Sequence, residues 1–466
     1  MNIQDWKRDT IVALATPPGE GGIGVIRISG SKAASIVDSI WKGKKKLSQF
    51  ESHKLYRGDF FHPKSKEKID NGLLVWMRAP NSFTGEEVLE LHMHGGPLLL
   101  NRILEACVFL GARLAEPGEF SRRAFLNGKI DLLQAEAIAE MIHAKSEKAL
   151  ANANSQLEGR ISEEISFLRE KLIDVLAQVE AAIDFPEEEI EILQPIALKK
   201  RIEEIGQKLE LWLQRFQIGR LIREGIRVAL VGRPNVGKSS LLNCFMGEDR
   251  AIVHDVPGTT RDVIEGYIQM QGLAWQIFDT AGIREVKEVV EKEGIRRSQR
   301  IAEQADLTLW LLDVSQEVTD EDYEVIQRLK PPVIIVGNKA DLPRVFSDFL
   351  KNRKDSPEWL FQDWVFISAK TGFGIEKLKE MMLKQVGLSI LGEKSHAYLN
   401  NARHRDAIKL ATLALEEALK ALQEQLPAEC LAADLRRASD SLAALLGKID
   451  HEEVLDKIFS QFCIGK

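Results

Sequence analysis

The sequence predicts a multidomain α/β protein that contains three kinds of segment. Near its middle, the apolar run Ile226–Val231 is followed by the glycine-rich stretch Gly232–Ser240 (GRPNVGKSS) and then by a helix-forming segment. This order of strand, loop and helix is typical of a parallel-rich sheet with helices on both faces. Upstream, short apolar segments separated by turns favour an α+β domain. Long stretches with apolar residues at every third or fourth position indicate extended helices around the central domain.

The length of 466 residues suits about three domains at ~150 residues each. Charged residues make up 29% of the chain and hydrophobic ones 44%, as in ordinary globular proteins. The formal net charge of −7 argues against a protein that grips nucleic acid through bulk positive charge. The four cysteines show no spacing typical of zinc sites or a disulfide framework. We expect a cytoplasmic chain without a membrane span, because no secretory signal and no apolar run of ~18 residues is seen.

The α+β region is expected from Thr10 to about Arg123. His92 and His94 fall on one face of a strand by alternation. A metal site there is not favoured, because no carboxylate or cysteine accompanies them at ligand spacing. The basic cluster Lys42–Lys46 is interpreted as a solvated loop, with an RNA contact as the alternative. The expected elements are strands at Ile11–Ala15, Gly24–Ile28 and Leu73–Met77, and helices at Ala33–Trp41 and Leu98–Leu110.

A helical region follows from about Leu126. Between Lys129 and Phe185 there is no proline and one glycine. The apolar stripe consists of Leu157, Ile161, Ile165, Leu168, Leu172, Val175, Val179 and Ile183, continued by Ile202, Ile205, Leu209 and Leu213 until Gly219. Helices are expected again over Arg405–Gln425, Leu431–Leu446 and Glu452–Phe462. One helical domain interrupted by an inserted α/β domain is the simplest architecture, because each amphipathic half needs a partner. Two independent helical segments are the alternative.

The central glycine-rich stretch fits G-x-x-x-x-G-K-[ST], the pattern of a phosphate-binding loop. Gly232 and Gly237 allow the backbone to curl, so that several N–H groups point at a polyphosphate. Lys238 supplies a positive charge near the β- and γ-phosphates, and the Ser239 hydroxyl is a ligand for Mg²⁺.

Four further motifs follow the loop in order, three of them at predicted strand ends. Thr259-Thr260-Arg261 provides a threonine for Mg²⁺, and Asp279-Thr-Ala-Gly282 follows the strand Leu273–Phe278 as a γ-phosphate sensor. Asn338-Lys-Ala-Asp341 follows the strand Pro332–Gly337, and Ser368-Ala-Lys370 follows Trp364–Ile367. The Asp341 carboxylate can accept from the N1–H and N2–H₂ groups of guanine, which adenine lacks. The motifs therefore predict a GTPase domain.

Segments outside this domain resemble one family closely. They are ATPPGEGGIGVIRISG (Ala15–Gly30), NSFTGEEVLELHMHGG (Asn81–Gly96), PGEFSRRAFLNGKIDLLQAEA (Pro117–Ala137) and the terminal CIGK. Together with the GTPase motifs they resemble the MnmE (TrmE) family of tRNA-modification GTPases nearly from end to end.

The resemblance implies a domain order. It consists of a tetrahydrofolate-binding and dimerisation domain at 1–123, a helical domain at 124–219 and 387–466, and a Ras-like GTPase domain inserted at 220–386. It implies a homodimer that acts on tRNA with the FAD-dependent partner MnmG, in a heterotetramer or larger complex. The expected product is an aminomethyl or carboxymethylaminomethyl group on C5 of the wobble uridine. The expected one-carbon donor is 5,10-methylene- or 5-formyl-tetrahydrofolate.

The resemblance also implies site residues. Arg27, Glu90, Lys129 and Lys466 match folate-binding positions: cations suit the glutamate tail and an acid suits the donor edge of the pterin. Cys463 is a candidate nucleophile or acid–base group, with a structural role as the alternative.

In the GTPase domain, Ile283 stands where Ras-like proteins carry a water-orienting glutamine, so another group must serve. The resemblance implies Glu291 as that catalytic group. It also implies a K⁺ ion held by Asn235, His254, Val256 and Thr259, with Mg²⁺ on Ser239 and Thr260. The implied nucleotide-binding set is Asn235, Val236, Gly237, Lys238, Ser239, Ser240, His254, Asp255, Val256, Pro257, Gly258, Thr259, Thr260, Asp279, Thr280, Ala281, Gly282, Asn338, Lys339, Asp341, Ser368, Ala369 and Lys370.

The competing hypothesis is a ribosome-assembly GTPase that binds ribosomal RNA and performs no modification chemistry. Such a protein would carry a basic RNA-binding module such as a KH domain, and no GxxG module of that kind is recognised in the sequence.

Overall fold

The computed structural model describes residues 9–184, 195–248, 266–279, 305–327, 329–330, 332–345, 364–388, 397–448 and 452–466. The chain divides into two compact units. Unit 1 comprises residues 1–139, 157–188 and 428–466, and unit 2 comprises residues 140–156 and 189–427. Both units therefore combine segments from distant parts of the sequence.

Unit 1 contains a seven-stranded sheet in the order β3-β4-β5-β6-β2-β1-β7. Neighbouring strands are antiparallel, except that β1 and β7 are parallel. Helices α2 and α3 pack on this sheet over a buried apolar core. The elements are β1 (Ile11–Leu14), β2 (Gly21–Ser29), α2 (Ala33–Ile40), β3 (Trp41–Gly43), η1 (Leu47–Gln49), β4 (Leu55–Phe61), β5 (Lys68–Met77), β6 (Val88–Gly95), α3 (Pro97–Phe109) and β7 (Arg113–Leu114). The predicted strands and helices of this region are confirmed, with ends that differ by a few residues.

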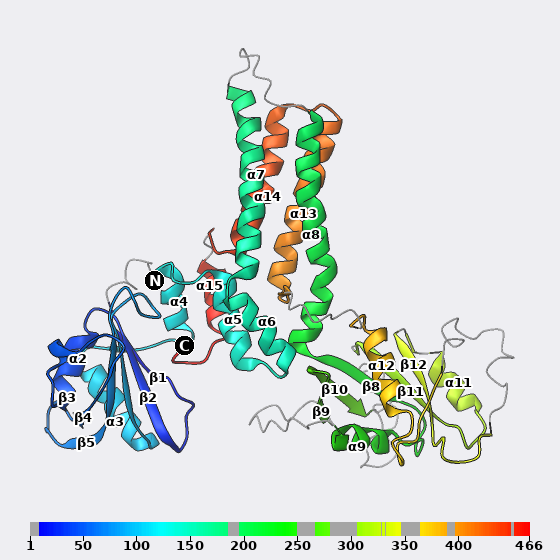
Figure 1. The fold of residues 1–466 in the computed structure, drawn as a ribbon, viewed down its shortest axis with the longest axis horizontal. Helices are drawn as coiled ribbons and strands as arrows, with labels where there is room; N and C mark the ends of the chain where they lie inside the picture. The colour runs from blue at the N-terminus through cyan, green and yellow to red at the C-terminus, as the bar shows by residue number, and fades with distance from the viewer. Residues whose placement is uncertain are drawn as a thin grey trace, which may run out of the picture. The chain divides into compact units, whose positions relative to one another are not determined.

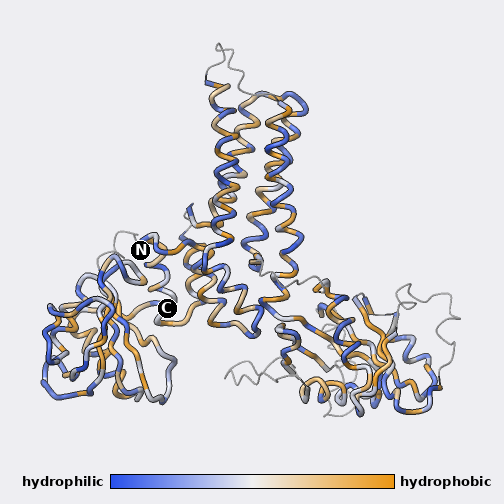
Figure 2. Tube along the Cα trace, viewed as in Figure 1, coloured by the Kyte–Doolittle hydropathy of each residue, from blue (hydrophilic) through white to orange (hydrophobic). Residues whose placement is uncertain are grey.

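The helical part of unit 1 pairs segments from before and after the central domain. Helix α7 (Arg160–Asp184) packs along α14 (Ala428–Leu445), and Figure 1 shows them side by side. Polar and apolar residues alternate along these helices (Figure 2). The remaining helices are α4 (Glu119–Leu126), α5 (Leu132–His143, apart from its last four residues, which belong to unit 2) and α15 (Glu452–Phe459). The buried residues of α7 are Ser162 and six of the predicted stripe residues: Ile161, Ile165, Leu168, Leu172, Val175 and Val179.

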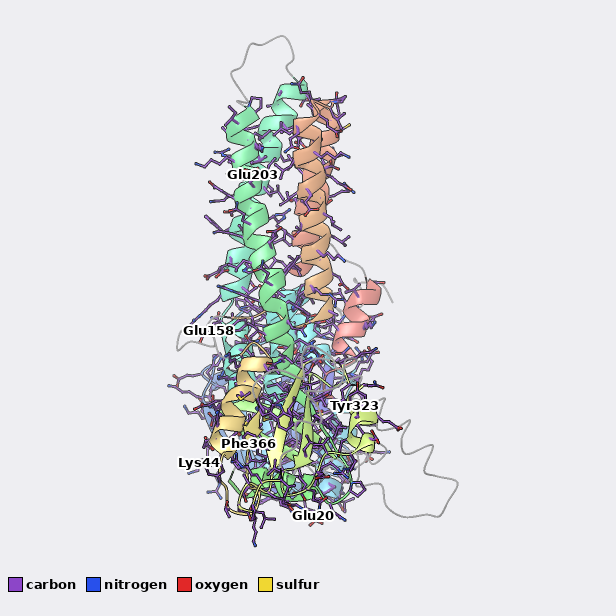
Figure 3. The ribbon with its side chains drawn as sticks, turned by 90° about the vertical axis from the view of Figure 1, so that its right-hand side faces the viewer. Glu20, Lys44, Glu158, Glu203, Tyr323 and Phe366 are labelled. Carbon is purple, nitrogen blue, oxygen red and sulfur yellow. The ribbon has the colours of Figure 1, made fainter. Side chains whose placement is uncertain are left out.

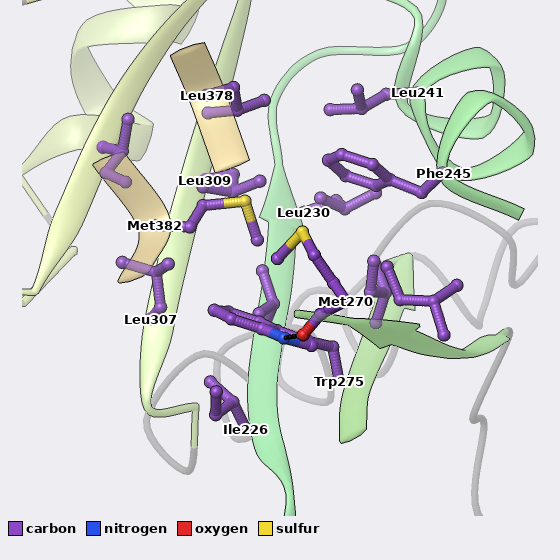
Figure 4. Close-up of a cluster of buried hydrophobic side chains, with 14 of the residues drawn as sticks. Ile226, Leu230, Leu241, Phe245, Met270, Trp275, Leu307, Leu309, Leu378 and Met382 are labelled. Carbon is purple, nitrogen blue, oxygen red and sulfur yellow. Dashed lines mark hydrogen bonds between the residues drawn. The ribbon is translucent and has the colours of Figure 1, made fainter. Parts of the chain in front are cut away.

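Unit 2 contains a six-stranded sheet in the order β13-β12-β11-β8-β10-β9, parallel except for the β9–β10 hairpin. Figure 4 shows its core, where the Trp275 Nε1–H donates to the Met270 carbonyl over 3.4 Å. The elements are β8 (Ile226–Val231), α9 (Lys238–Glu248), β9 (Gly266–Met270), β10 (Leu273–Asp279), β11 (Leu307–Asp313), α11 (Asp320–Ile326), β12 (Val333–Asn338), β13 (Val365–Phe366) and α12 (Ile375–Gln385). The predicted multidomain α/β fold, with its inserted P-loop domain, is confirmed.

Three further helices complete unit 2: α6 (Glu147–Leu157, apart from its last residue), α8 (Pro195–Glu224) and α13 (Ala402–Gln423). Helix α8 packs along α13, so a second pair also joins the two helical stretches.

The end of α8 differs from the sequence prediction. The helical period was expected to stop at Gly219, yet the helix continues to Glu224. A Cβ at residue 219 would lie 2.2 Å from the carbonyl oxygen of Leu399. The glycine therefore permits a close backbone approach within the helix and does not mark its end.

Candidate functional site

The phosphate loop has backbone geometry that requires its glycines. Gly232 and Gly237 have φ angles of +155° and +101°, and Asn235 between them has φ +66°. A Cβ at Gly232 would lie 2.4 Å from the Leu311 carbonyl oxygen, and one at Gly237 would lie 2.1 Å from Asn338 Nδ2. The loop therefore passes too close to its neighbours for a side chain at either glycine.

The Lys238 side chain lies against this loop and is buried. Its Nζ donates to the carbonyl oxygens of Gly232, over 2.7 Å, and of Arg233, over 2.8 Å. The ammonium is thus held at the loop, where it would meet a bound polyphosphate.

Asn338 joins three of the predicted motifs. Its Nδ2 donates to the Val236 carbonyl over 2.8 Å, and its Oδ1 accepts from the Ala369 N–H over 3.0 Å. The side chain is buried, so both bonds are shielded from water. The phosphate loop, the 338–341 motif and the 368–370 motif therefore come together around this side chain.

Near the 338–341 motif, two carboxyl groups have pKa values below the usual value. The Asp341 side chain is exposed, and a hydrogen bond from Ser368 lowers its pKa. Lys339, at φ +64°, donates from Nζ to Asp313 Oδ2 over 2.6 Å. Burial would raise the pKa of Asp313, but the bonds from Lys339 and Ser315 hold it below the usual value. Asp313 was not predicted, although its place at the carboxyl end of β11 was a signal for it.

Part of the predicted nucleotide site lies outside the described residues. This holds for His254, Asp255, Val256, Pro257, Gly258, Thr259, Thr260, Thr280, Ala281, Gly282, Ile283 and Glu291. Asp279 ends β10, but its side chain is not among those described. Ser239, Ser240 and Lys370 are described and lie in the motifs as predicted.

A second candidate site lies in unit 1, where the C-terminal tail meets the sheet. Arg27 Nε pairs with Glu90 Oε1 at 2.8 Å, and Arg27 Nη1 donates to the Gly465 carbonyl over 3.1 Å. The guanidinium also lies over the Phe120 ring, 5.6 Å from its centroid. The Phe120 N–H donates to the Lys466 carbonyl over 3.2 Å. Three of the predicted folate residues, Arg27, Glu90 and Lys466, are thereby gathered in one place.

The tail has little freedom where it docks. Gly465 is buried with φ +97°, and a Cβ there would lie 2.3 Å from the Leu14 carbonyl oxygen. The Gly118 N–H donates to the Cys463 carbonyl over 3.4 Å, while the Cys463 side chain is exposed. An exposed thiol therefore lies two residues before Gly465, whose carbonyl oxygen accepts from Arg27.

Glu90 is held as a carboxylate. His92, whose Nε2 lies 3.5 Å from Glu90 Oε2, and Arg27 lower the pKa of Glu90 from 4.5 to about 2 despite burial. His92 was not predicted as part of this site. Its place two residues from Glu90 on the same strand face was the available signal.

Lys129, the fourth predicted folate residue, makes a different contact. Its Nζ donates to the Pro80 carbonyl over 3.0 Å. It lines an open pocket of about 490 Å³ together with Gln134 and Lys448. Within the described part of the chain, no direct contact joins Lys129 to Arg27, Glu90 or Lys466.

A buried ionic network supports the tail site and was not predicted. Arg123 pairs with Asp9 at 2.6 Å, Glu119 at 2.9 Å and Glu86 at 3.2 Å. Burial alone would lower the pKa of Arg123, but the three carboxylates raise it by more, so the pKa lies above its usual value. Glu119 begins α4, so the network fixes the helix start whose Gly118 and Phe120 N–H groups hold the tail.

The two histidines for which the sequence did not favour a metal site both lie near carboxylates. His94 Nδ1 lies 2.9 Å from Asp70 Oδ1, and His92 faces Glu90. Within the described ranges, no group of three or more His, Cys, Asp or Glu side chains could hold a metal ion. None of the helices in those ranges has the length and apolar character needed to cross a membrane.

Sequence comparison assigns the family. Residues 132–463 match the MnmE helical domain, and residues 10–129 match the N-terminus of the GTP-binding protein TrmE. The chain belongs to the MnmE family. The tRNA modification GTPase MnmE of Aquifex aeolicus is 44% identical over 98% of this chain and 100% of its own length. The protein of the same name from Moorella thermoacetica is 44% identical over 98% and 99%, and that from Alkaliphilus oremlandii is 40% identical over 98% and 99%.

Among solved structures, Aquifex aeolicus Era bound to GDP and AlF₄⁻ resembles part of the chain. It is 28% identical, covers 41% of this chain and 66% of its own, and has a TM-score of 0.28. The MnmE family assignment does not depend on this partial likeness.

Proposed function

We propose that the chain is a GTPase that acts in tRNA modification, like the MnmE relatives that carry this name. It would add an aminomethyl or carboxymethylaminomethyl group to C5 of the wobble uridine, with a tetrahydrofolate derivative as one-carbon donor and MnmG as flavin-dependent partner. The observation that carries this proposal is the docked C-terminal tail beside Arg27 and Glu90. A chain that only hydrolysed GTP would not need this second site.

The nucleotide site supports GTP and Mg²⁺ as ligands. Lys238 and the glycine loop suit the phosphates, and Ser239 lies in the first turn of α9, where P-loop proteins hold Mg²⁺, with Thr260 as the proposed second ligand. Asp341 is an ionised acceptor suited to the two donors of guanine.

The proposed K⁺ ion would supply positive charge where negative charge develops during hydrolysis. Asn235 suits this role, because its left-handed backbone leaves its side chain exposed on the loop. Glu291 would orient the attacking water. Hydrolysis in KCl is therefore expected to be faster than in matched NaCl, and equal rates would remove K⁺ from the proposal.

The folate proposal is tested by equilibrium binding of 5-formyl-tetrahydrofolate. Glu90 is an ionised acceptor for the pterin donor edge, so Glu90→Gln should weaken folate binding and leave GTP binding in the other unit unchanged. The same variant should lower modification activity. A wild-type protein that hydrolyses GTP but binds no folate would favour the ribosome-assembly alternative.

The proposal also covers the domains, the oligomeric state and the partner. Its domains would be 1–123 for folate binding and dimerisation, 124–219 with 387–466 for the helical domain, and 220–386 for the GTPase domain. A cytoplasmic homodimer would bind MnmG, and GTP with K⁺ would bring its two GTPase domains together. Spin-label distances between these domains, with GDP and with a transition-state mimic plus K⁺, test the closure. An unchanged distance would contradict it.

A further inference from the structure

One edge of the unit 1 sheet concentrates positive charge. Residues 42–68 contain nine Lys and Arg residues against three Asp and Glu, a net charge of +6. The whole chain has a net charge of −7, so the other residues together have a charge of −13. Positive charge is therefore segregated in one short segment of an acidic protein.

The fold places this segment on an exposed margin. Strand β3 is the edge strand, and it pairs with β4 so that Trp41 lies opposite Phe60 and Gly43 lies opposite Gly58. Lys44, labelled in Figure 3, leaves β3 at one end of β4, and the turn at 62–67 lies at the other end. The seven residues of β4 extend roughly 20 Å. We call the exposed cations of residues 42–66, apart from Lys54, which pairs with Glu51, the basic edge: Lys42, Lys44, Lys45, Lys46, Arg57, Lys64 and Lys66.

The acidic residues of the segment are already neutralised. Glu51 pairs with Lys54, Asp59 pairs with Lys68 at 2.8 Å, and Glu67 pairs with Arg102 at 3.4 Å. No member of the basic edge forms an ion pair with a carboxylate of the described residues. Lys42 and Lys45 instead lie over the rings of Phe61 and Tyr56, at 4.9 and 5.4 Å. The positive charge of the edge is thus available to a partner.

We propose that the basic edge binds the phosphate backbone of RNA, and this inference rests on the proposed action on tRNA. The edge presents mostly lysine charges over roughly 20 Å. Such an arrangement suits a row of phosphates, because binding phosphates requires positive charge and no contact with the bases. An acidic protein partner is less favoured, because the edge lacks the exposed aromatic anchors of protein interfaces. Backbone binding of this kind would accept several tRNAs of different sequence.

The test compares two triple variants with the same charge change. Lys44→Glu, Lys45→Glu and Lys46→Glu reverse the basic edge, while Lys199→Glu, Lys200→Glu and Arg201→Glu reverse a basic triplet at the start of α8. Affinity for unmodified tRNA is measured by filter binding over a series of salt concentrations. A third variant with glutamine at 44, 45 and 46 separates lost attraction from added repulsion.

We expect the edge variants to bind tRNA more weakly. The slope of log affinity against log salt should fall by about 2–3, at roughly 0.7–0.9 per lost phosphate contact. The α8 variant should keep the wild-type slope, and all three variants should keep GTP hydrolysis and folate binding. An unchanged slope in the edge variants, or an equal fall in the α8 variant, would overturn the inference and leave the proposed function standing. A wild-type protein with no affinity for tRNA would overturn both.

Discussion

At the scale of single residues, those whose role depends on a short sequence motif were the easiest to predict. The phosphate-loop glycines follow from a local motif, and the structure shows the close approaches to Leu311 and Asn338 that require them. Arg123 could not be predicted in the same way. Its carboxylate partners Asp9, Glu86 and Glu119 come from three separate segments, so only the fold reveals that this charge is buried and neutralised.

Asp341→Asn tests the proposed role of Asp341 in guanine recognition. The amide replaces an ionised acceptor, so one donor of guanine would lose its partner. We expect GTP affinity to fall by about 10²-fold or more and preference to shift towards XTP. Nucleotide titrations measure this. Retained GTP affinity without XTP binding would contradict the role of Asp341.

Glu90→Gln tests the charge at the tail site through its pH dependence. The pKa of Glu90 is lowered from 4.5 to about 2, so its ionised form stabilises the fold above pH 4.5. That contribution is lost as pH falls towards 2. Urea unfolding should therefore show a stability gap between wild type and variant that is largest at neutral pH and narrows below pH 4.5. A gap that stays constant down to pH 3 would show that Glu90 is not held ionised by Arg27 and His92.

At the scale of elements, helix existence was predictable and helix ends were not. Apolar periodicity identified α7, α8, α13 and α14, because their buried stripes are long. The end of α8 was misplaced at Gly219, because glycine is also used where two backbones meet.

Two glycine substitutions in α8 should have opposite effects. Gly219→Ala places a Cβ 2.2 Å from the Leu399 carbonyl oxygen, and such overpacking costs about 1–3 kcal/mol. A Cβ at Gly206, in the same helix, would have no heavy atom within 4 Å, so Gly206→Ala should stabilise by about 0.4–1 kcal/mol. Urea unfolding of both variants measures the difference. The same sign in both would contradict this account of Gly219.

Helix α6 joins several parts of unit 2. The Lys148 N–H donates to the Gly272 carbonyl in the turn of the β9–β10 hairpin, over 3.0 Å. Asn152 Oδ1 accepts from the Tyr398 N–H over 2.7 Å, while Asn152 Nδ2 and Gln156 Nε2 donate to the Tyr398 carbonyl. The helix therefore contacts both the hairpin leading to Asp279 and the segment that leaves the GTPase fold.

Asn152→Ala should disrupt this connection. It removes two partly buried hydrogen bonds, at a cost of about 1–3 kcal/mol. Asn154→Ala, on an exposed position of the same helix, should change stability by no more than about 0.5 kcal/mol. We expect Asn152→Ala to retain GTP binding and to lose modification activity, and nucleotide titration with tRNA nucleoside analysis measures both. Equal behaviour of the two variants would contradict a coupling role for Asn152.

At the scale of the whole molecule, the sequence indicated a discontinuous helical region, and the structure pairs α7 with α14 and α8 with α13. The docking of the last residues against Arg27 followed from no local pattern, because the two lie at opposite ends of the chain. The family resemblance was the only guide to it.

The central claim is that GTP hydrolysis and folate-dependent tRNA modification are joined in this chain. Mass spectrometry of tRNA nucleosides tests it most directly, in a strain from which the gene is deleted and then restored as wild type, Lys238→Ala or Glu90→Gln. We predict that deletion removes the aminomethyl or carboxymethylaminomethyl group from wobble uridine, that the wild-type gene restores it, and that neither variant does so fully. Unchanged nucleosides after deletion, or full restoration by both variants, would contradict the account.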